Sequence, residues 1–302
     1  MNFRDLIKEI CIEEKIDYKL ISKDWIMVLT KNKVSKCISG YRFPLNNHSI
    51  GSVIDDKYAF FDLCKHLKLP IIQHKILFNP NTELGNNTFK LLEETFQEYD
   101  HNIVLKPNIG TEGNNVYHIT NKQDLKKTVN KLFEHNFSIS ICPFYKIDNE
   151  YRVIVLNKKV KLIFEKNKPV VIGNGKNTIK ELLLKLNPHY FKNIIFDERF
   201  NRVLKDKEIY EYDWRFNLSK GATAKLIDDM NLYNKLSNIA LDVCNKIGAE
   251  FLSVDIIKCE NNFYLMEANS GVCINKVCNF IDSDLKLVKE IYREAIILMF
   301  EK

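Results

Sequence analysis

The segment 251–273, FLSVDIIKCENNFYLMEANSGVC, constrains the fold more than any other part of this chain. Two apolar runs flank a polar turn at 260–262, a pattern that predicts an antiparallel β-hairpin. Three polar residues, Asp255, Glu267 and Asn269, lie within these runs. Side chains alternate along a strand, so Glu267 and Asn269 share a face. A loop centred in the turn places Asp255 opposite Glu267, within about 5 Å at the Cβ atoms.

The two carboxylates of this predicted hairpin indicate a cation site. Carboxylates that close repel one another and are costly to bury unless a cation lies between them. With the carboxamide oxygen of Asn269 they form a set of hard ligands that suits Mg2+. The alternative is a hairpin whose polar residues lie on a solvated face. Because both strands look apolar on both faces, the sequence favours the cation site.

Length and composition indicate a globular protein of more than one layered unit. The 302 residues allow two or three such units, and a hydrophobic fraction of 45% is ample for their cores. No apolar run approaches the roughly 18 residues of a membrane-spanning helix. The segment 1–15 is charged and amphipathic and lacks the apolar centre of a signal peptide. The eight cysteines form no CxxC pair and no zinc pattern, so we expect free thiols in a reducing cytoplasm and no membrane partner.

The charge pattern gives little support to nucleic-acid binding. The formal net charge of +6 is small for this length, and the lysines are scattered among acids without a long basic run. A small ligand that carries phosphate accounts for such a modest excess equally well. We therefore expect a small-molecule site and no nucleic-acid partner.

The N-terminal third predicts a small α/β unit followed by a link and a helix. The unit comprises a helix over 3–15 and strands over 18–21, 25–30 and 34–38. The segment 42–56 is interpreted as a link to a helix that begins at Asp56 and ends near Leu67. Lys57 falls in the first turn of this helix, where the helix dipole disfavours a cation. It is either an ordinary solvated lysine or a residue with another purpose.

The segment 103–119, IVLKPNIGTEGNNVYHI, has the features of a phosphate-binding loop. An apolar strand delivers Lys106, a polar loop follows with Gly110, Thr111 and Gly113, and a second apolar strand completes the unit. Small residues let backbone N–H groups approach phosphate oxygens, and a lysine supplies the compensating charge. The lysine precedes the loop, so this is not the Walker pattern. A glycine-containing hairpin without a ligand stays open as the alternative.

The remaining segments predict alternating strands and helices. Asp124 is expected to cap a helix, and 150–166 predicts a hairpin that opens with Glu150 and Arg152 on one face. That pair is either part of a site or a surface ion pair of little energetic value. The segment 186–214 is interpreted as an insertion that covers a site or moves. Two further helices are predicted, over 231–247 and over 283–300 with Ser283 as its cap.

Five short motifs occur in a fixed order and together resemble the ATP-grasp superfamily. They are KPxxGxxGxxV, ExR, GxGxxTIxEL, RxNxSxG and D-x11-E-x-N. The blocks GNGKNTIKELL and RFNLSKGATA are most similar to the ATP-grasp modules of cyanophycin synthetase and bifunctional glutathione synthetase. The resemblance spans about residues 43–275. It implies an α+β fold in which two α+β subdomains clasp ATP. The expected division is a small N-terminal α/β unit (1–45) and an ATP-grasp domain (46–302), with ATP bound by about 103–145 and the metal site within about 150–302.

The resemblance also implies roles for individual residues. Those assigned to ATP are Lys57, Lys106, Gly110, Thr111, Gly113, Pro143, Phe144, Tyr145, Lys146, Glu150 and Arg152. Those assigned to two Mg2+ ions, for which Mn2+ can substitute, are Asp255, Glu267 and Asn269. Those assigned to the transferred phosphoryl group are Arg215, Asn217 and Lys166. Relatives carry Glu where this chain has Pro143, Arg where it has Lys166, and a Pro-Gly segment where it has 270–272.

The implied activity is ligation of a small carboxylate to an amine through an acyl phosphate. The substrates are expected to be amino acids or small peptides, and a homodimer is compatible with the sequence. No Ser-His-Asp or catalytic cysteine arrangement is present, in agreement with a reaction that needs mainly positioning and cations. The first alternative is a catalytically reduced nucleotide-binding protein that acts as a regulator or scaffold. The second is phosphoryl transfer to an acceptor that is not a carboxylate.

Overall fold

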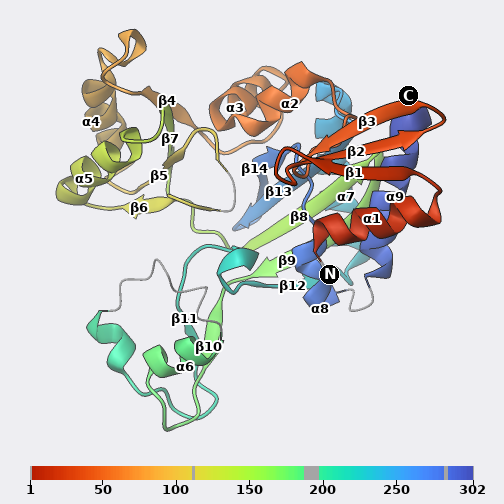
Figure 1. Ribbon diagram of the computed structural model, residues 1–302. Coiled ribbons are helices and arrows are strands. Elements are labelled where there is room, and N and C mark those ends of the chain that lie inside the picture. The colour runs from red at the N-terminus through yellow and green to blue at the C-terminus, as the bar shows by residue number, and fades with distance from the viewer. Residues whose placement is uncertain (1, 111–112, 187–196, 282–284, 302) are drawn as a thin grey trace.

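A five-stranded antiparallel sheet forms the centre of the computed structural model, which describes residues 2–110, 113–186, 197–281 and 285–301 (Figure 1). Its order is β12-β9-β8-β13-β14, so the two predicted hairpins lie side by side and the second forms one edge. The strands are β8 (Asn149–Leu156), β9 (Lys159–Asn167), β12 (Thr223–Leu226), β13 (Phe251–Cys259) and β14 (Asn262–Asn269). Figure 1 shows this sheet between a four-stranded body and an N-terminal unit, with a small lobe below.

Both faces of the central sheet are covered, which explains why its inner strands are apolar on both sides. One face packs against α7 (Met230–Ile247) through Leu236, Ala240 and Val243. The other face packs against α9 (Lys286–Glu301), where Tyr292 is fully buried. Asp229 caps α7, as its carboxylate accepts the amides of the first turn.

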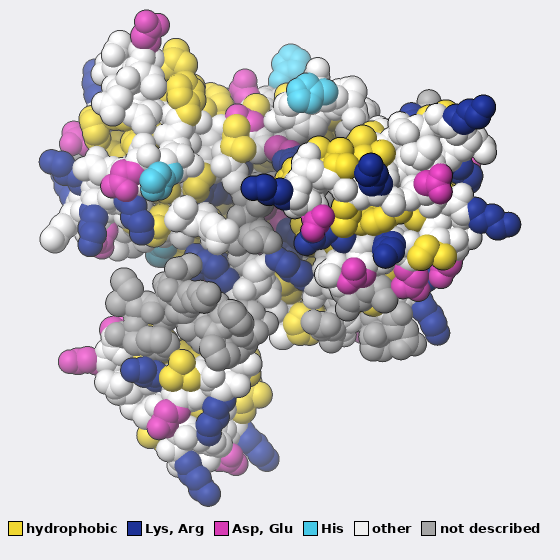
Figure 2. Space-filling model, in the orientation of Figure 1, with side chains coloured by type: hydrophobic (Ala, Val, Ile, Leu, Met, Phe, Trp, Pro, Cys, Tyr) yellow, Lys and Arg dark blue, Asp and Glu magenta, His cyan; other side chains and the backbone are white. Residues whose placement is uncertain are grey.

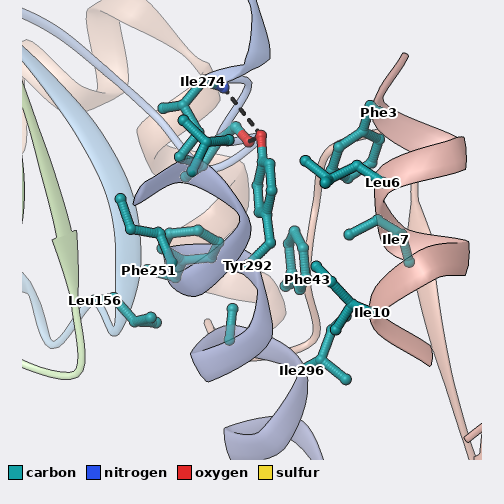
Figure 3. Close-up of a cluster of buried hydrophobic side chains, with 14 of the residues drawn as sticks. Phe3, Leu6, Ile7, Ile10, Phe43, Leu156, Phe251, Ile274, Tyr292 and Ile296 are labelled. Atoms are coloured by element: carbon teal, nitrogen blue, oxygen red, sulfur yellow. Dashed lines mark hydrogen bonds between the residues drawn. The ribbon is translucent and has the colours of Figure 1, made fainter. Parts of the chain in front are cut away.

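The N-terminal unit packs against α9 and shares its core. It contains α1 (Phe3–Glu13) and a sheet of β1 (Asp17–Ile21), β2 (Ile26–Lys31) and β3 (Val34–Ser39), as the sequence predicts. Figure 3 shows Tyr292 between Phe3 of α1 and Phe251 of β13. The Tyr292 hydroxyl donates to the carbonyl of Val272 at 3.1 Å and accepts the amide of Ile274 at 3.0 Å. The unit is thereby fixed to the loop that follows β14.

A four-stranded antiparallel sheet of order β4-β7-β5-β6 forms the second body. Its elements are β4 (Lys75–Phe78), η1 (Glu83–Gly85), α4 (Thr88–Glu98), β5 (Ile103–Pro107), β6 (Tyr117–Ile119), α5 (Lys122–Phe133) and β7 (Ser138–Pro143). Both helices bury their apolar stripes on one face of the sheet. The opposite face, with Val104, Lys106 and Cys142, lines a cavity. Asn121 caps α5 and accepts the amide of Asp124, so the predicted cap at Asp124 is wrong by one turn.

The predicted link 42–56 contains a helix, which corrects that interpretation. This helix, α2 (His48–Asp55), is capped by Asn47, whose side chain accepts the amide of Ile50 at 2.8 Å. It leads directly into α3 (Lys57–His66), which Asp56 caps as expected. This eight-residue helix is difficult to predict from the sequence, because Asn46, Asn47 and Gly51 are residue types typical of turns.

The small lobe surrounds a separate apolar core made by Val171, Ile179, Leu183, Phe200 and Leu204. Its elements are β10 (Val170–Ile172), α6 (Ile179–Leu186), η3 (Glu198–Asn201) and β11 (Ile209–Glu211). Part of the predicted insertion, 187–196, and the predicted cap Ser283 lie outside the described residues. The remaining short elements are η4 (Leu218–Lys220), η5 (Asn275–Val277) and α8 (Cys278–Ile281). No helix in the described ranges has the length and apolar content to span a membrane.

Candidate functional site

A cavity of about 600 Å³ lies where the four-stranded body, the central sheet and the N-terminal unit meet. Most of the site residues predicted from the sequence line it. They are Lys57, Lys106, Gly110, Gly113, Pro143, Phe144, Tyr145, Glu150, Arg152, Lys166, Arg215, Asn217, Asp255, Glu267 and Asn269. Lys146 is exposed and is not part of the lining, and Thr111 lies outside the described residues. On the face shown in Figure 2, basic and acidic side chains are interspersed, without one continuous basic surface.

The β13–β14 hairpin has the predicted register, with Asp255 directly opposite Glu267. Asp255 is 1% exposed, and the side chains of Glu267 and Asn269 line the cavity without a hydrogen bond or ion pair to any other described residue. No cluster of three or more His, Cys, Asp or Glu side chains suited to a metal occurs among the described residues. The oxygen donors at this place are the carboxylates of Asp255 and Glu267 and the carboxamide of Asn269, and those of Asp255 already accept hydrogen bonds from Arg152 and Lys166. Such hard oxygen donors fit Mg2+.

A buried ion-pair cluster holds the Asp255 carboxylate. Arg152 donates from Nε to Oδ1 and from Nη2 to Oδ2, both at 2.6 Å. Lys166 Nζ lies 2.5 Å from Glu150 Oε1 and 3.0 Å from Asp255 Oδ2. The strand register causes this, because Asp255 pairs with Arg152 across β13–β8 and Glu150 pairs with Lys166 across β8–β9. The idea of a surface pair between Glu150 and Arg152 is therefore wrong, since each has a buried partner from another strand.

The protonation state of the cluster follows from burial and partners. Burial raises the pKa of Asp255, but Arg152 and then Lys166 outweigh it and bring that pKa to about 2. For Glu150, burial raises the pKa more than Lys166 lowers it. Two acids and two bases balance one another in this cluster. Removing one partner would leave an uncompensated buried charge, so the arrangement is costly to break.

Two lysines from different elements converge on the loop that follows β5. Lys106 is buried at the end of β5, and Lys57 Nζ donates to the carbonyls of Asn108 at 3.3 Å and Gly110 at 2.9 Å. The Asn108 side chain also accepts the amide of Tyr58, which ties the start of α3 to the loop. Burial lowers the pKa of Lys57, Glu267 opposes this, and Lys106 adds to it. The unfavourable position of Lys57 on its helix therefore places an ammonium group at the cavity.

The loop between β5 and β6, called the glycine loop because it contains Gly110 and Gly113, contacts the segment 213–221 across the cavity. The guanidinium group of Arg215 donates three hydrogen bonds to the Asp213 carboxylate, and its Nη1 donates to the carbonyl of Gly113 at 3.4 Å. Lys220 Nζ donates to the same carbonyl at 3.4 Å. Gly113 has φ of 62°, and a Cβ there would lie 2.5 Å from Asn217 Nδ2. Only glycine satisfies both the backbone conformation and this close approach.

An aromatic group lies beside the segment that joins the two bodies. The rings of Phe144 and His118 stack with centroids 3.8 Å apart, and Trp214 meets both rings edge-on. The amide of Phe144 donates to the carbonyl of Asn102 at 2.9 Å. The cavity wall here is largely apolar, with Val104, Ile147, Ile257 and Met266 among its members. This end of the cavity suits a flat, weakly polar ring.

The opposite end of the cavity contains residues that the sequence did not reveal as functional. Tyr41 and Arg42 come from the N-terminal unit, Asp55 ends α2, and Cys273 and Lys276 follow β14. The residues near Arg215 that escaped prediction are Asp213 and Lys220. Asp213 could have been found from its spacing to Arg215, whereas nothing in the sequence links Arg42 to Asp55.

Comparisons with known proteins agree with this fold. Residues 202–291 match the RimK-like ATP-grasp domain. No curated protein sequence matches the chain. The predicted similarity to bifunctional glutathione synthetase is confirmed for the fold, whereas that to cyanophycin synthetase stays a prediction.

Three solved structures illustrate the similarity. A bifunctional glutathione synthetase from Pasteurella multocida has a TM-score of 0.56 at 15% identity, over 96% of this chain and 44% of that one. A D-alanine–D-alanine ligase from Bacillus anthracis has a TM-score of 0.56 at 14% identity, over 85% and 72%. The VanG D-Ala:D-Ser ligase from Enterococcus faecalis has a TM-score of 0.56 at 12% identity, over 84% and 64%. The chain thus spans less than half the length of the glutathione synthetase.

Proposed function

Because the chain has the ATP-grasp fold, we propose that it is an ATP-dependent ligase that joins a carboxylate to an amine. The observation that carries this proposal is the convergence of cationic and acidic groups on one cavity. Lys57 and Lys106 come from one side, Asp255 and Glu267 from another, and Arg215 from a third. Cations and metal ligands that meet in this way suit a polyphosphate more than any neutral ligand.

We assign the nucleotide to the part of the cavity between the two sheets. The base would lie against the apolar wall beside Phe144, and the phosphates would extend toward Lys57 and Lys106. Asp255, Glu267 and Asn269 are the residues that would hold Mg2+, which neutralises phosphate charge when bound. We further propose that residues 1–45 form a small N-terminal α/β unit, packed on an ATP-grasp domain that comprises 46–302.

The proposed reaction has two steps. An oxygen of the substrate carboxylate attacks the γ-phosphorus of ATP, and the bond to ADP breaks, which gives an acyl phosphate. The amine then attacks the carbonyl carbon, phosphate leaves with the electron pair of the C–O bond, and the amine nitrogen loses a proton. Little covalent chemistry is required of the protein, so its contribution is positioning and charge stabilisation.

Individual residues of the chain have separate tasks in this proposal. Arg215 and Asn217 would hold the transferred phosphoryl group. The contact of Gly113 with 213–221 would exclude water that could otherwise hydrolyse the acyl phosphate. Lys166 is engaged with Glu150 and Asp255, so we assign it to fixing the Asp255 carboxylate and not to contact with the phosphoryl group.

Release of ADP tests this function. The protein is incubated with ATP, Mg2+ and a pool of amino acids and dipeptides, beside a Glu267→Gln variant. We expect ADP release that requires Mg2+, the pool and Glu267, together with a new amide product. Nucleotide binding without ADP release from any pool would favour a regulator or scaffold. A phosphorylated product without an amide would indicate transfer to an acceptor other than a carboxylate.

A further inference from the structure

The wall of the cavity opposite the base-binding end is built from two distant parts of the chain. Arg42 forms an isolated antiparallel bridge with Gly271, and the amide of Val272 donates to the carbonyl of Tyr41 at 3.1 Å. The N-terminal unit and the loop after β14 are therefore joined by backbone hydrogen bonds. The backbone of Tyr41 and Arg42 is therefore held at a fixed position relative to Glu267 and Asn269.

Arg42 is held in one orientation by two partners. Its Nε donates to Asp55 Oδ2 at 2.8 Å and to Ser270 Oγ at 3.3 Å, and its Nη2 lies 2.6 Å from Asp55 Oδ2. Asp55 also accepts the amide of Ser270 at 3.1 Å. Ser270 directly follows Asn269, so the hydrogen bond from Arg42 to Ser270 positions the guanidinium group next to the candidate metal site. A planar, pre-oriented guanidinium loses little entropy when it binds a second anion.

The guanidinium group retains binding capacity toward the cavity. Its Nη1 has no hydrogen-bond or ion-pair partner among the residues that the structure describes, and the side chain is 50% exposed while Asp55 is 20% exposed. Lys276 also lines the cavity, and its Nζ donates to Ser219 Oγ at 2.7 Å. Asp55 is already bonded to Arg42 and Ser270. The Nη1 group of Arg42 therefore favours an anionic group of the substrate.

We propose that Arg42 determines specificity by binding a substrate carboxylate that is not the one phosphorylated. This inference rests on the proposed ligase function and names its substrate class, which is an amino acid, a peptide or a dicarboxylic acid. A monocarboxylic acid and a simple amine offer no such second group. Tyr41 and Trp25 lie on the same wall and provide aromatic surface for the rest of the substrate.

Binding without turnover tests the proposal independently of ligase activity. The chain contains two tryptophans, so a Trp214→Phe variant retains Trp25 as its single fluorescent reporter at this wall. Three probes are titrated in the presence of ADP and Mg2+. They are a pool of non-aromatic, non-acidic amino acids, the same pool as carboxamides, and a mixture of succinate and glutarate. The first two differ only in the α-carboxylate, and the third lacks an amine.

We expect either the free amino acids or the dicarboxylates to change the fluorescence of Trp25, and the carboxamides to have no effect. Arg42→Gln should weaken that binding about 10- to 100-fold, as expected when a charge-assisted hydrogen bond is lost. Arg42→Lys should restore part of it. The matched control is Arg4→Gln, because Arg4 lies in the same unit, pairs with Asp24 and does not line the cavity. Its binding should equal that of the parent protein.

The probe that requires Arg42 identifies the source of the carboxylate. If binding of the amino-acid pool requires Arg42, Arg42 binds the carboxylate of the amine substrate. If binding of the dicarboxylates requires Arg42, it binds the second carboxylate of the acid substrate. Equal binding of acids and carboxamides, or equal binding by Arg42→Gln and the parent, would overturn the proposal. A folded Arg42→Gln protein is verified by circular dichroism, and the double variant with Asp55→Asn removes the acid that would otherwise lack its partner.

The two proposals fail in different ways. If ADP release is absent but probe binding requires Arg42, the ligase function is wrong and the carboxylate site stands. If ADP release occurs and Arg42→Gln leaves the KM of both substrates unchanged, the function stands and the assignment of Arg42 is wrong. The expected result is a higher KM for one substrate, with kcat and the KM for ATP unchanged.

Discussion

The two ends of the cavity hold their charges in different ways. At the end that we assign to the nucleotide, called the nucleotide end, Lys166, Glu150 and Asp255 are each at most 6% exposed in their side chains and come from adjacent strands of one sheet. At the opposite end, Arg42 is half exposed, and its partners come from a helix and from a loop 228 positions away. The first arrangement is fixed by strand register, whereas the second depends on how separate units pack.

The two arrangements should differ in how far amino-acid replacement lowers the stability of the protein. A buried cluster in which every charge has a partner loses stability when any member is replaced. The groups of a half-exposed pair can bond to water instead. Replacing one of them therefore changes ligand binding more than it changes the stability of the fold. Replacement at the end that we assign to the nucleotide is therefore expected to lower stability, and replacement at the opposite end is expected to change mainly ligand binding.

The largest expected effect concerns turnover at the nucleotide end. Glu267→Gln should lower kcat by about 1000-fold, because it removes charge from the proposed metal site and several kcal/mol of charge stabilisation with it. Its thermal stability should stay near that of the parent, since the Glu267 side chain has no ion pair among the described residues. The control is Glu260→Gln in the exposed turn of the same hairpin. Equal loss of activity in both variants would contradict the metal assignment.

The next largest effect is a loss in the free energy of unfolding, which should be large for a replacement at the nucleotide end and small for one at the opposite end. Lys166→Met should lower the free energy of unfolding by about 3–5 kcal/mol, because Glu150 and Asp255 would stay buried with one cation between them. Urea denaturation provides the measurement. Lys225→Met is the matched control on the neighbouring strand, where the lysine is 63% exposed, and should cost less than about 1 kcal/mol. Arg42→Gln should resemble this control, and a loss as large as that of Lys166→Met would remove the distinction drawn between the two ends.

A smaller effect is expected at the contact between the glycine loop and 213–221. Gly113→Ala should reduce kcat about tenfold, because its Cβ would meet Asn217 Nδ2 and its φ of 62° disfavours a side chain. Gly248→Ala isolates the second cause, since Gly248 has φ of 70° and open space around it. Kinetic assays of both variants decide the matter. Unchanged kcat in Gly113→Ala would show that the contact has no part in turnover.

The smallest effect is a change in pH dependence. Burial lowers the pKa of Lys57, so the free protein should lose the Lys57 charge at a pH below the usual lysine value of about 10.4. The value of kcat/KM for ATP should therefore fall as the pH rises through that lowered pKa. Lys57→Arg, which stays charged, should shift the fall to higher pH. Superimposable pH profiles for the two proteins would exclude Lys57 from phosphate binding.

The features that the sequence predicts well are those encoded within one hairpin. The pairing of Asp255 with Glu267 follows from two apolar runs and a short turn, and the structure has that register. The β5–β6 unit with Lys106 is similarly local, because its strands and loop are contiguous. In both segments the alternation of side chains determines which residues share a face.

The features that escaped prediction depend on contacts between distant segments. Arg42 and Ser270 are brought together only when the N-terminal unit packs against α9, and no periodicity encodes that packing. The short helix α2 was hidden by residues that also favour turns, although Asn47 is a good cap. The buried partners of Arg152 and Glu150 likewise required the order of strands in the sheet, which the sequence did not provide.

An isotope-transfer experiment tests the central claim, that the protein activates a carboxylate by transferring the γ-phosphoryl group of ATP to it. The pool that supports ADP release is prepared with 18O in its carboxylates, and the released phosphate is analysed by mass spectrometry. The acyl-phosphate route predicts one 18O atom in each phosphate, because the oxygen that attacked phosphorus leaves with it. Phosphate that contains no 18O would contradict the account, since the phosphoryl group would then have gone to water or to another acceptor.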